Sequence, residues 1–476
     1  MAVRDEFFWL SKVNQATIVI NSKLGLLPKP IAIEAARALR EVIADGEKDP
    51  ALRPKTYITF EPKMIAKSGP EITIMHAGRS SQDIHATYRA ATLREKALEV
   101  ADGLLTVMKT IEKLAIKHKD VVLPNYTNGV AAQPNAYSHY LIAFLYGFLR
   151  DFARLEEFYE RLNVCPMGST VLNGTCWPLD RREMAKRLGF SGIAYNAFDA
   201  TQVAQSDLPV EFSSIVTAIA IHITSFLTDL MVQYAQPRPW ILLQEGGDNT
   251  YVSSAMPQKR NPGLVNNCRT EASEVIGQAQ GVVFRAHNLE TGMLDPKKQD
   301  LHAALGNRAV NMLKLFNKVL NALVVDKERA LEELNNDWTA SQEVADVLMH
   351  EFGLPFRVGH HVASQMVSFA RANKILPLDF PYEEMKRIYK EVIEKEYPTA
   401  SSELPMSLER FKAALDPVAI INNRKTEGGP QPAEIEKMLQ DVKDKNEKRT
   451  QWLEKQVTQI NQSLQNLESE FNQIGE

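Results

Sequence analysis

The segment LIAFLYGFLRDFARLEEFYERL, from Leu141 to Leu162, decides the fold class of this chain. Its apolar residues recur at alternating spacings of four and three, which is the period of one helix face. The residues on this face are Leu141, Leu145, Phe148, Phe152, Leu155, Tyr159 and Leu162. A helix with so long an apolar stripe needs partner helices to cover it, so the segment predicts an elongated helical bundle.

Other long segments between residues 79 and 330 carry the same period. One stripe consists of Ala101, Leu104, Met108, Ile111 and Ala115, and another, after Asp207, of Ile215, Ile219, His222 and Phe226. A further helix is predicted from Pro262 to about His287. We assign residues 79–330 to this central bundle and interpret His222, on its apolar face, as a core residue.

The flanking regions have shorter patterns. Residues 1–78 contain short helical stretches broken by prolines, and residues 331–430 return to shorter helices before Gly428, Gly429 and Pro430. The length of 476 residues also favours about three domains, at ~150 residues each. We therefore predict an all-α chain with an N-terminal domain at 1–78, the bundle at 79–330 and a C-terminal domain at 331–430.

Residues 431–476 form a separate helical extension with heptad-like spacing. Its apolar residues are Ile435, Leu439, Val442, Leu453, Val457, Ile460, Leu464, Leu467, Phe471 and Ile474, and Asn446 interrupts the series. Fewer than ~4 heptads are unbroken. Two interpretations remain open: one helix packed on its own subunit, or a coiled coil between subunits.

Composition excludes several classes of protein. The net charge is -4, and the basic residues are scattered, which argues against nucleic-acid binding. The three cysteines show no CxxC spacing, so neither a disulfide framework nor a zinc site is expected. The N-terminus lacks an apolar run of signal-peptide length, and no stretch approaches ~20 apolar residues. We expect a cytoplasmic protein that does not act at a membrane.

The stretch YVSSAMPQKRNP, from Tyr251 to Pro262, follows two glycines and turn-forming polar residues. Asn261 is predicted as the N-cap of the next helix and Pro262 as its first position. A loop ending at a helix N-terminus brings backbone N–H groups and a positive dipole end toward developing negative charge. The competing interpretation is a lysine-containing surface turn.

This stretch resembles the GSSxMPxKxNP signature of the fumarase/aspartase superfamily, and the chain is most similar to its argininosuccinate lyase branch. Four other segments agree in order and spacing: HAGRSSQD at 76–83, YTNGVAAQP at 126–134, NVCPMGSTVLNGTCWPLDRREMAKRLGF at 163–190 and FGLPFRVGHH at 352–361. The resemblance implies a three-domain fold whose long bundle joins three others in a homotetramer with a twenty-helix core. It also implies active sites shared by three chains, and no metal or cofactor.

The resemblance assigns the proton-abstracting base to Ser253, and the carboxylate that takes up charge to Lys259 and Asn261. Ser254 and Met256 stand at substrate-binding positions of the same loop. A serine is a weak base unless its anion is stabilised, and a cationic lysine with nearby N–H donors provides such stabilisation. Val252 stands where the signature has glycine, which predicts an altered hinge for the loop.

The segment HAGRSSQD places donor groups before a helix, and the superfamily uses such a turn to bind a carboxylate. The predicted substrate-binding residues here are Arg79, Ser80, Ser81 and Gln82. Gln82 replaces the asparagine usual in the branch, so contact with the amine part is expected to differ. The alternative is a helix-capping loop. Thr17 stands where the branch has a substrate-contacting hydroxyl, and the alternative is a threonine on a helix surface.

In YTNGVAAQP, Thr127 and Gln133 match substrate-binding positions, but Asn128 stands where the family has a histidine. That histidine normally pairs with a glutamate whose position is occupied here by Asn266. Removing one partner of a buried charged pair strands the other charge, whereas both are replaced here. We therefore expect a neutral replacement, for example a hydrogen bond between Asn128 and Asn266.

In DPKKQDLHAAL, at 295–305, His302 and Leu305 replace a glutamine and a lysine that hold substrate in argininosuccinate lyases. His302 is retained as a substrate-binding candidate. His302 or His85 is a candidate acid toward the leaving group, and each has the alternative of a structural histidine.

The resemblance and its departures imply a cofactor-free carbon–nitrogen lyase. It would cleave an N-substituted succinate to fumarate and an amine, with a small-molecule succinyl-amine as its substrate. The alternatives are a genuine argininosuccinate lyase, a cycloisomerase-type enzyme of the same fold, and a catalytically silent paralogue. The identity of the amine stays open, because the altered positions lie on the amine side.

Overall fold

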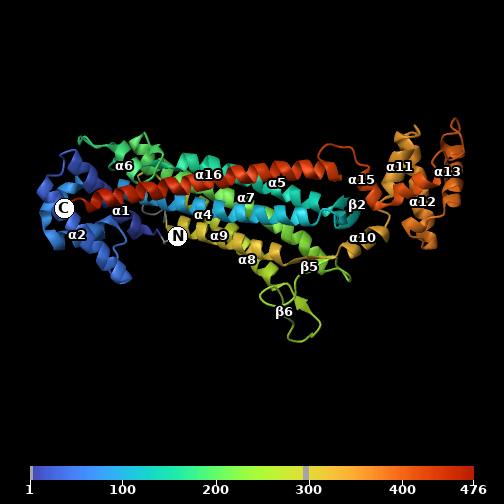
Figure 1. The fold of residues 1–476 in the computed structure, drawn as a ribbon, viewed down its shortest axis with the longest axis horizontal. Helices are drawn as coiled ribbons and strands as arrows, with labels where there is room; N and C mark the ends of the chain where they lie inside the picture. The colour runs from blue at the N-terminus through green and yellow to red at the C-terminus, as the bar shows by residue number, and fades with distance from the viewer. Residues whose placement is uncertain (1–3, 293–299, 476) are drawn as a thin grey trace.

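The computed structural model describes residues 4–292 and 300–475, and its architecture is an elongated bundle with a smaller helical region at each end (Figure 1). The N-terminal region consists of α1 (Glu6–Lys23), α2 (Lys29–Lys48), η1 (Pro50–Leu52), α3 (Tyr57–Ser68) and η2 (Pro70–His76). Asp5 caps α1, and Pro62 lies inside α3. The short helical stretches expected in residues 1–78 are thus present.

Five long helices form the central bundle: α4 (Ser81–Lys117), α5 (Tyr137–Leu162), α7 (Ala204–Tyr234), α8 (Gly263–Ala286) and α9 (Asp300–Ala322). They contact in a ring, in the order α4, α5, α7, α8, α9 and back to α4. The apolar stripes predicted from sequence lie in this interior, where Leu141, Phe148, Phe152 and Ile219 are fully buried. The helical fold class is thus confirmed.

Short elements connect the long helices. They are the hairpin β1 (Val122–Thr127) and β2 (Val130–Ala136), the parallel pair β3 (Val164–Cys165) and β4 (Gly192–Ile193), α6 (Arg181–Arg187), and the π-helix η3 (Asp199–Val203). Two more antiparallel pairs are β5 (Ile241–Leu243) with β8 (Leu323–Val325), and β6 (Tyr251–Val252) with β7 (Arg260–Asn261). The β6–β7 pair projects from the side of the bundle (Figure 1).

The C-terminal region has its own hydrophobic core, built from residues between Trp338 and Ile420. Its elements are α10 (Lys327–Asn335), α11 (Ser341–His350), α12 (Phe356–Asn373), η5 (Pro377–Asp379), α13 (Tyr382–Glu396), α14 (Leu408–Leu415) and α15 (Pro417–Asn422). The N-terminal region and the bundle share one continuous core. The domain limits at 78, 330 and 430 stay a prediction.

The C-terminal extension is one helix, α16 (Pro432–Asn472), which runs back along the bundle to the N-terminal region (Figure 1). It packs on α1, α4, α5 and α6 of its own chain. Its apolar seam joins the main core, with Val442, Ile460 and Leu467 almost completely buried. Within this chain the extension therefore follows the first of the two interpretations, a helix packed on its own subunit.

One helical stretch in the described part of the chain, Asp199–Tyr234, is long and apolar enough to cross a membrane by length and composition. It comprises η3 and α7, and α7 contacts α5, α8 and α9 inside the bundle. Its buried apolar side chains, such as Ile219 and Phe226, therefore have protein partners, as is usual for a helix in the core of a bundle.

Candidate active site

Arg79 lies just before α4 and is buried, with 6% of its surface exposed. Its Nη2 donates a hydrogen bond to Asn14 Oδ1 at 2.7 Å, and its guanidinium stacks over the Tyr57 ring at 5.0 Å. Its Nε and Nη1 have no hydrogen-bond partner among the residues that the structure describes. A buried guanidinium with unused N–H donors suits an anionic group, because hydrogen bonds between charged partners are stronger than neutral ones.

The neighbouring residues of the turn form the N-terminus of α4. Ser80 is the N-cap and forms a capping box with Asp83, while Ser81 and Gln82 lie half-buried in the first turn. Asp83 Oδ2 accepts hydrogen bonds from the backbone N–H groups of Gly168, at 2.9 Å, and Thr170, at 3.1 Å. Burial raises the pKa of Asp83 to about 6. The segment is therefore a helix cap as well as the carrier of Arg79.

Thr17 of α1 lines the same small cavity as Arg79, together with Asn21, Gly168 and Arg181. Its hydroxyl donates to the Val13 carbonyl at 2.8 Å, and the residue is 1% exposed. The structure thus brings Thr17 and Arg79 together, although they are far apart in sequence. The hydroxyl retains lone pairs that can accept a hydrogen bond.

Thr127, Asn128 and Gln133 belong to the β1–β2 hairpin. Asn128 and Gly129 form its two-residue turn, with φ angles of 52° and 77°. Asparagine and glycine are the residues that tolerate this left-handed conformation, so the turn itself gives a reason for asparagine at 128. Gln133 Nε2 donates to Gln342 Oε1 at 2.6 Å, which ties the hairpin to the C-terminal region.

The expected hydrogen bond between Asn128 and Asn266 is not formed within this chain: both residues are described, and their side chains do not bond to each other. Asn128 is exposed at the hairpin tip, and Asn266 is exposed in the first turn of α8. The hairpin and α8 make no extensive contact with each other within the chain, which keeps the two side chains apart.

Ser253 lies in the loop between β6 and β7, and its Oγ accepts hydrogen bonds from two backbone N–H groups. The donors are Met256 N, at 3.2 Å, and Ala255 N, at 3.4 Å. The Ser253 backbone N–H donates to the Lys259 carbonyl at 3.2 Å. Donors aimed at the hydroxyl oxygen favour its ionised form, so this geometry stabilises negative charge on Ser253.

The other loop residues surround Ser253. Ser254, Met256 and Lys259 are exposed, and Asn261 Nδ2 donates to the Tyr251 carbonyl at 3.4 Å. Asn261 lies in β7 rather than at the helix N-cap; α8 begins at Gly263, Pro262 occupies the cap position, and no side chain caps it. The predicted cap was wrong because residues 260–261 pair with 251–252 as strands, which removes Asn261 from the helix start.

Val252 forms part of that strand pair, opposite Arg260, and is 56% exposed. Valine favours extended backbone, so it suits the strand that begins this loop.

His302 lies at the start of α9 and lines a second cavity, with Arg4, Tyr88 and Arg89. Burial, with smaller contributions from Arg285 and Arg89, lowers the pKa of His302 to about 3. Its imidazole is therefore neutral near pH 7. His85 Nε2 accepts a hydrogen bond from the Tyr57 backbone N–H at 3.2 Å, beside the Arg79 turn. Residues 295–299 of the DPKKQDLHAAL segment lie outside the residues that the structure describes.

His222 was interpreted as a core residue, and it is half-buried beside the bundle interior. Its Nδ1 lies 2.6 Å from Oδ2 of Asp151, whose side chain is completely buried. Leu305 is fully buried in α9 and offers no polar contact to a substrate.

A single chain keeps the candidate motifs apart. Arg79 precedes α4 and Thr127 follows it, and α4 has 37 residues, or about 55 Å at ~1.5 Å per residue. In Figure 1 the serine loop projects from the hairpin half of the bundle, away from the N-terminal region that holds Arg79. The chain therefore forms three local groups: Thr17 with Arg79, Thr127 with Asn128, and Ser253 with Lys259 and Asn261.

The capping box of Ser80 with Asp83 agrees with the helix-capping alternative for this turn. Other contacts were missed by sequence reasoning. Asn14 and Tyr57 contact Arg79 from other elements, and no local pattern marks them. Among residues 4–292 and 300–475, no group of three or more His, Cys, Asp or Glu side chains is arranged to hold a metal ion.

Comparison with known proteins gives two family matches. Residues 4–277, more than half of the chain, match the family model described as lyase. Residues 338–422 match the one described as argininosuccinate lyase C-terminal.

Similar curated proteins include the argininosuccinate lyase of Methanocaldococcus jannaschii, 25% identical over 94% of this chain and 90% of that protein. The argininosuccinate lyase of Oceanobacillus iheyensis is 29% identical over 90% of this chain and 92% of that protein.

Among solved structures, an EDDS lyase in complex with formate matches with a TM-score of 0.88, at 22% identity, over 98% of this chain and 91% of that chain. The 3-carboxy-cis,cis-muconate lactonizing enzyme from Pseudomonas putida matches with a TM-score of 0.69, at 17% identity, over 94% of this chain and 96% of that chain. At these identities the two structures establish the fold.

Proposed function

Because the chain belongs to the argininosuccinate lyase-like branch of the fumarase/aspartase superfamily, we propose that it is a carbon–nitrogen lyase. It cleaves an N-substituted succinate to fumarate and an amine. The observation that carries this proposal is Ser253, whose hydroxyl oxygen accepts two backbone N–H groups in the signature loop.

The elimination needs a base and a site for developing charge. Ser253 Oγ, as the alkoxide, takes the proton from the carbon next to a carboxylate. The electron pair left on that carbon forms the new double bond, the carbon–nitrogen bond breaks, and the nitrogen leaves with its electron pair and takes up a proton. The backbone donors of Ala255 and Met256 lower the free energy of the alkoxide, and the cationic Lys259 shares its loop.

The substrate end that becomes fumarate carries carboxylates. We propose Lys259 and Asn261 for the carboxylate beside the reacting carbon, and the Arg79 turn, with Ser80, Ser81, Gln82 and Thr17, for a second anionic group. The Nε and Nη1 donors of Arg79, which have no hydrogen-bond partner among the described residues, support this role. Thr127, Asn128, Gln133, Ser254, Met256 and His302 complete the proposed binding set. We place the enzyme in the cytoplasm.

The separation of the motifs supports a shared site. The Arg79 turn and the β1–β2 hairpin lie at opposite ends of α4, whose length of about 55 Å far exceeds that of a small succinyl-amine. We propose a homotetramer in which neighbouring chains supply the groups that one chain holds apart.

Fumarate formation tests the function directly. A panel of N-succinyl amines and amino acids is incubated with the protein, and fumarate is followed by its absorbance. We expect Ser253→Ala to lose about 10²–10⁴-fold in kcat, the usual contribution of a general base. Ser368→Ala, on an exposed face of α12, is the matched control and keeps the base. A folded tetramer that is inert toward the whole panel, and toward fumarate plus an amine library read by mass spectrometry, contradicts the proposal.

Genuine argininosuccinate lyase is the second candidate, favoured by the C-terminal family match. Complementation of an arginine auxotroph decides it. We expect failure, because Asn128, Asn266 and the buried Leu305 stand where that branch has charged residues.

A further inference from the structure

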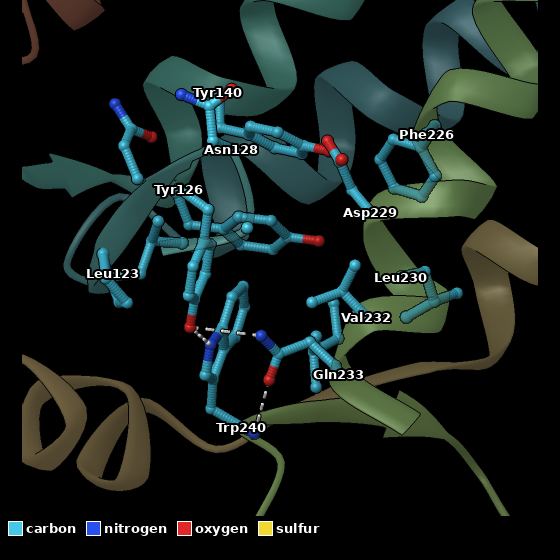
Figure 2. A pocket seen from close by; sticks show the side chains of 15 residues that line it. Leu123, Tyr126, Asn128, Tyr140, Phe226, Asp229, Leu230, Val232, Gln233 and Trp240 are labelled. Atoms are coloured by element: carbon cyan, nitrogen blue, oxygen red, sulfur yellow. Dashed lines mark hydrogen bonds between the residues drawn. The ribbon is translucent and has the colours of Figure 1, made fainter. Parts of the chain in front are cut away.

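A deep pocket lies beside the Asn128 turn, between the β1–β2 hairpin, the start of α5 and the end of α7 (Figure 2). Its volume is about 300 Å³, at the lower end of the ~300–1,000 Å³ range of small-molecule sites. Five aromatic residues line it: Tyr126, Tyr137, Tyr140, Phe226 and Trp240. The pocket is therefore lined by several aromatic rings.

One acidic group, Asp229, stands at this pocket. Its Oδ2 accepts a hydrogen bond from the Tyr140 hydroxyl at 2.8 Å, and Figure 2 shows the two side chains facing each other. Within the part of the chain that the structure describes, no lysine, arginine or histidine lies within ion-pair distance of Asp229. Asp229 is exposed, so it adds an unpaired negative charge at the solvent-accessible part of the pocket.

The phenol groups add polar sites inside the pocket. The Tyr126 hydroxyl accepts N–H groups from Gln233 Nε2 and Trp240 Nε1, each at 3.3 Å, which fixes both rings (Figure 2). Tyr137 is 2% exposed, and its hydroxyl has no partner among the described residues. Burial raises the pKa of Tyr137 and of Tyr140, so both phenols stay neutral and their oxygens accept hydrogen bonds.

We propose that this pocket binds an organic ammonium cation, and that the cation is the amine portion of the substrate. Aromatic faces attract an ammonium group through their quadrupoles, Asp229 supplies the counter-charge, and the free Tyr137 oxygen accepts an N–H. The same carboxylate repels the dicarboxylate product. The second part of the inference rests on the proposed lyase function, and Asn128, which lines the pocket, connects it to the hairpin of the predicted site.

Binding is tested without catalysis. Isothermal titration compares n-butylammonium with 1-butanol, a neutral analogue of similar shape, in the full-length protein. We expect the ammonium to bind at least about tenfold more tightly, and Asp229→Asn to remove that preference. Tyr140→Phe leaves the aromatic ring and the Asp229 carboxylate in place, so this variant should still prefer the ammonium to the alcohol. Asp444→Asn, on the exposed face of α16, is the matched control for lost charge. Equal binding of the two probes, or an unchanged preference in Asp229→Asn, overturns the inference.

Kinetics test the link to the reaction. In the reverse direction, Asp229→Asn should raise the KM of the amine about tenfold and leave the KM of fumarate unchanged. If butylammonium binding depends on Asp229 but the amine KM does not, the pocket is a cation site outside the substrate path, and that part is overturned. If the wild type turns over no amine at all, the proposed lyase function fails, and the assignment to substrate falls with it, while the titration still decides the cation site.

Discussion

Arg79 is a buried cation whose partner inside the chain is an uncharged amide. Asn14 Oδ1 holds Nη2 at 2.7 Å, and Asn14 itself is completely buried. A neutral tether fixes the guanidinium without neutralising it, so its charge stays available for a substrate carboxylate. We infer that Asn14 is a positioning residue, and that its neutrality matters as much as its hydrogen bond.

The prediction is that Asn14→Asp weakens substrate binding. The new carboxylate has the same shape and gives Arg79 an internal counter-charge that competes with the substrate. Hydrogen bonds to charged groups contribute ~1.5–3 kcal/mol, so we expect KM for the succinyl substrate to rise by about ten- to a hundredfold with a smaller change in kcat. Steady-state kinetics and the fumarate inhibition constant measure this. Asn373→Asp, on an exposed helix face, is the control; an unchanged KM in Asn14→Asp refutes the role.

His302 gives a prediction about pH. Burial lowers its pKa from 6.5 to about 3 in the folded chain. Between these two values the unfolded chain binds more protons than the folded one, so the stability of the fold rises with pH across this window and falls on acidification. His302→Gln should remove part of that acid sensitivity. Denaturant midpoints between pH 4 and 7 measure it, with the exposed His350→Gln as control. Parallel pH profiles for wild type and His302→Gln would contradict the buried neutral state.

At the scale of elements, α16 is a helix that links the ends of the molecule. Asn446 donates from Nδ2 to Glu112 Oε2 at 2.7 Å, at the point where its apolar seam is interrupted. Near its end, Lys12 pairs with Glu468, and Arg40 donates to the carbonyls of Phe471 and Ile474. The interruption in the heptads is therefore a polar contact to α4, which explains why the seam need not continue as a coiled coil.

The prediction for this element is a loss of stability in Leu467→Ala. Leu467 lies on the buried face of α16 and is fully buried. Truncation of a buried leucine to alanine costs ~2–5 kcal/mol, because burial is lost and a cavity remains. Chemical unfolding, read at fixed protein concentration, should show an earlier midpoint. Gln465→Ala, two residues away on the exposed face, should leave the midpoint unchanged. Equal midpoints for the two variants would mean that α16 does not pack on its own chain in solution.

The same elements show what sequence could predict. The long helices were readable because an apolar stripe repeated over five or more turns has few alternatives, as in the segment from Leu141 to Leu162. The two-residue strands around Ser253 could not be predicted, because strands of two residues show no alternation of apolar and polar residues. Asn261 was therefore assigned to a helix cap instead. Signature residues were found by resemblance, whereas Asn14 and Asp229 act through contacts between distant elements that no local pattern records.

At the scale of the whole molecule, length is the feature that matters for function. The N-terminal region holds Arg79, and the hairpin and serine loop lie toward the other end of the bundle (Figure 1). A rigid five-helix bundle cannot fold over to join them, because its helices are continuous and packed along their length. Antiparallel association of bundles would bring one end of each chain beside the opposite end of another, and closed symmetry then generates equivalent sites.

Mixed tetramers test this arrangement. Arg79→Ala and Ser253→Ala should each be nearly inactive, but each chain keeps the group that the other has lost. If one site takes Arg79 and Ser253 from different chains, co-expressed chains with two different tags should regain about one quarter of wild-type activity, since half of each group is intact at random. Tandem purification isolates the hybrids, and native mass spectrometry gives their stoichiometry. Two differently tagged Ser253→Ala chains form the control and should stay inactive. If the hybrids are as inactive as their parents, both groups come from one chain, and the shared site is excluded.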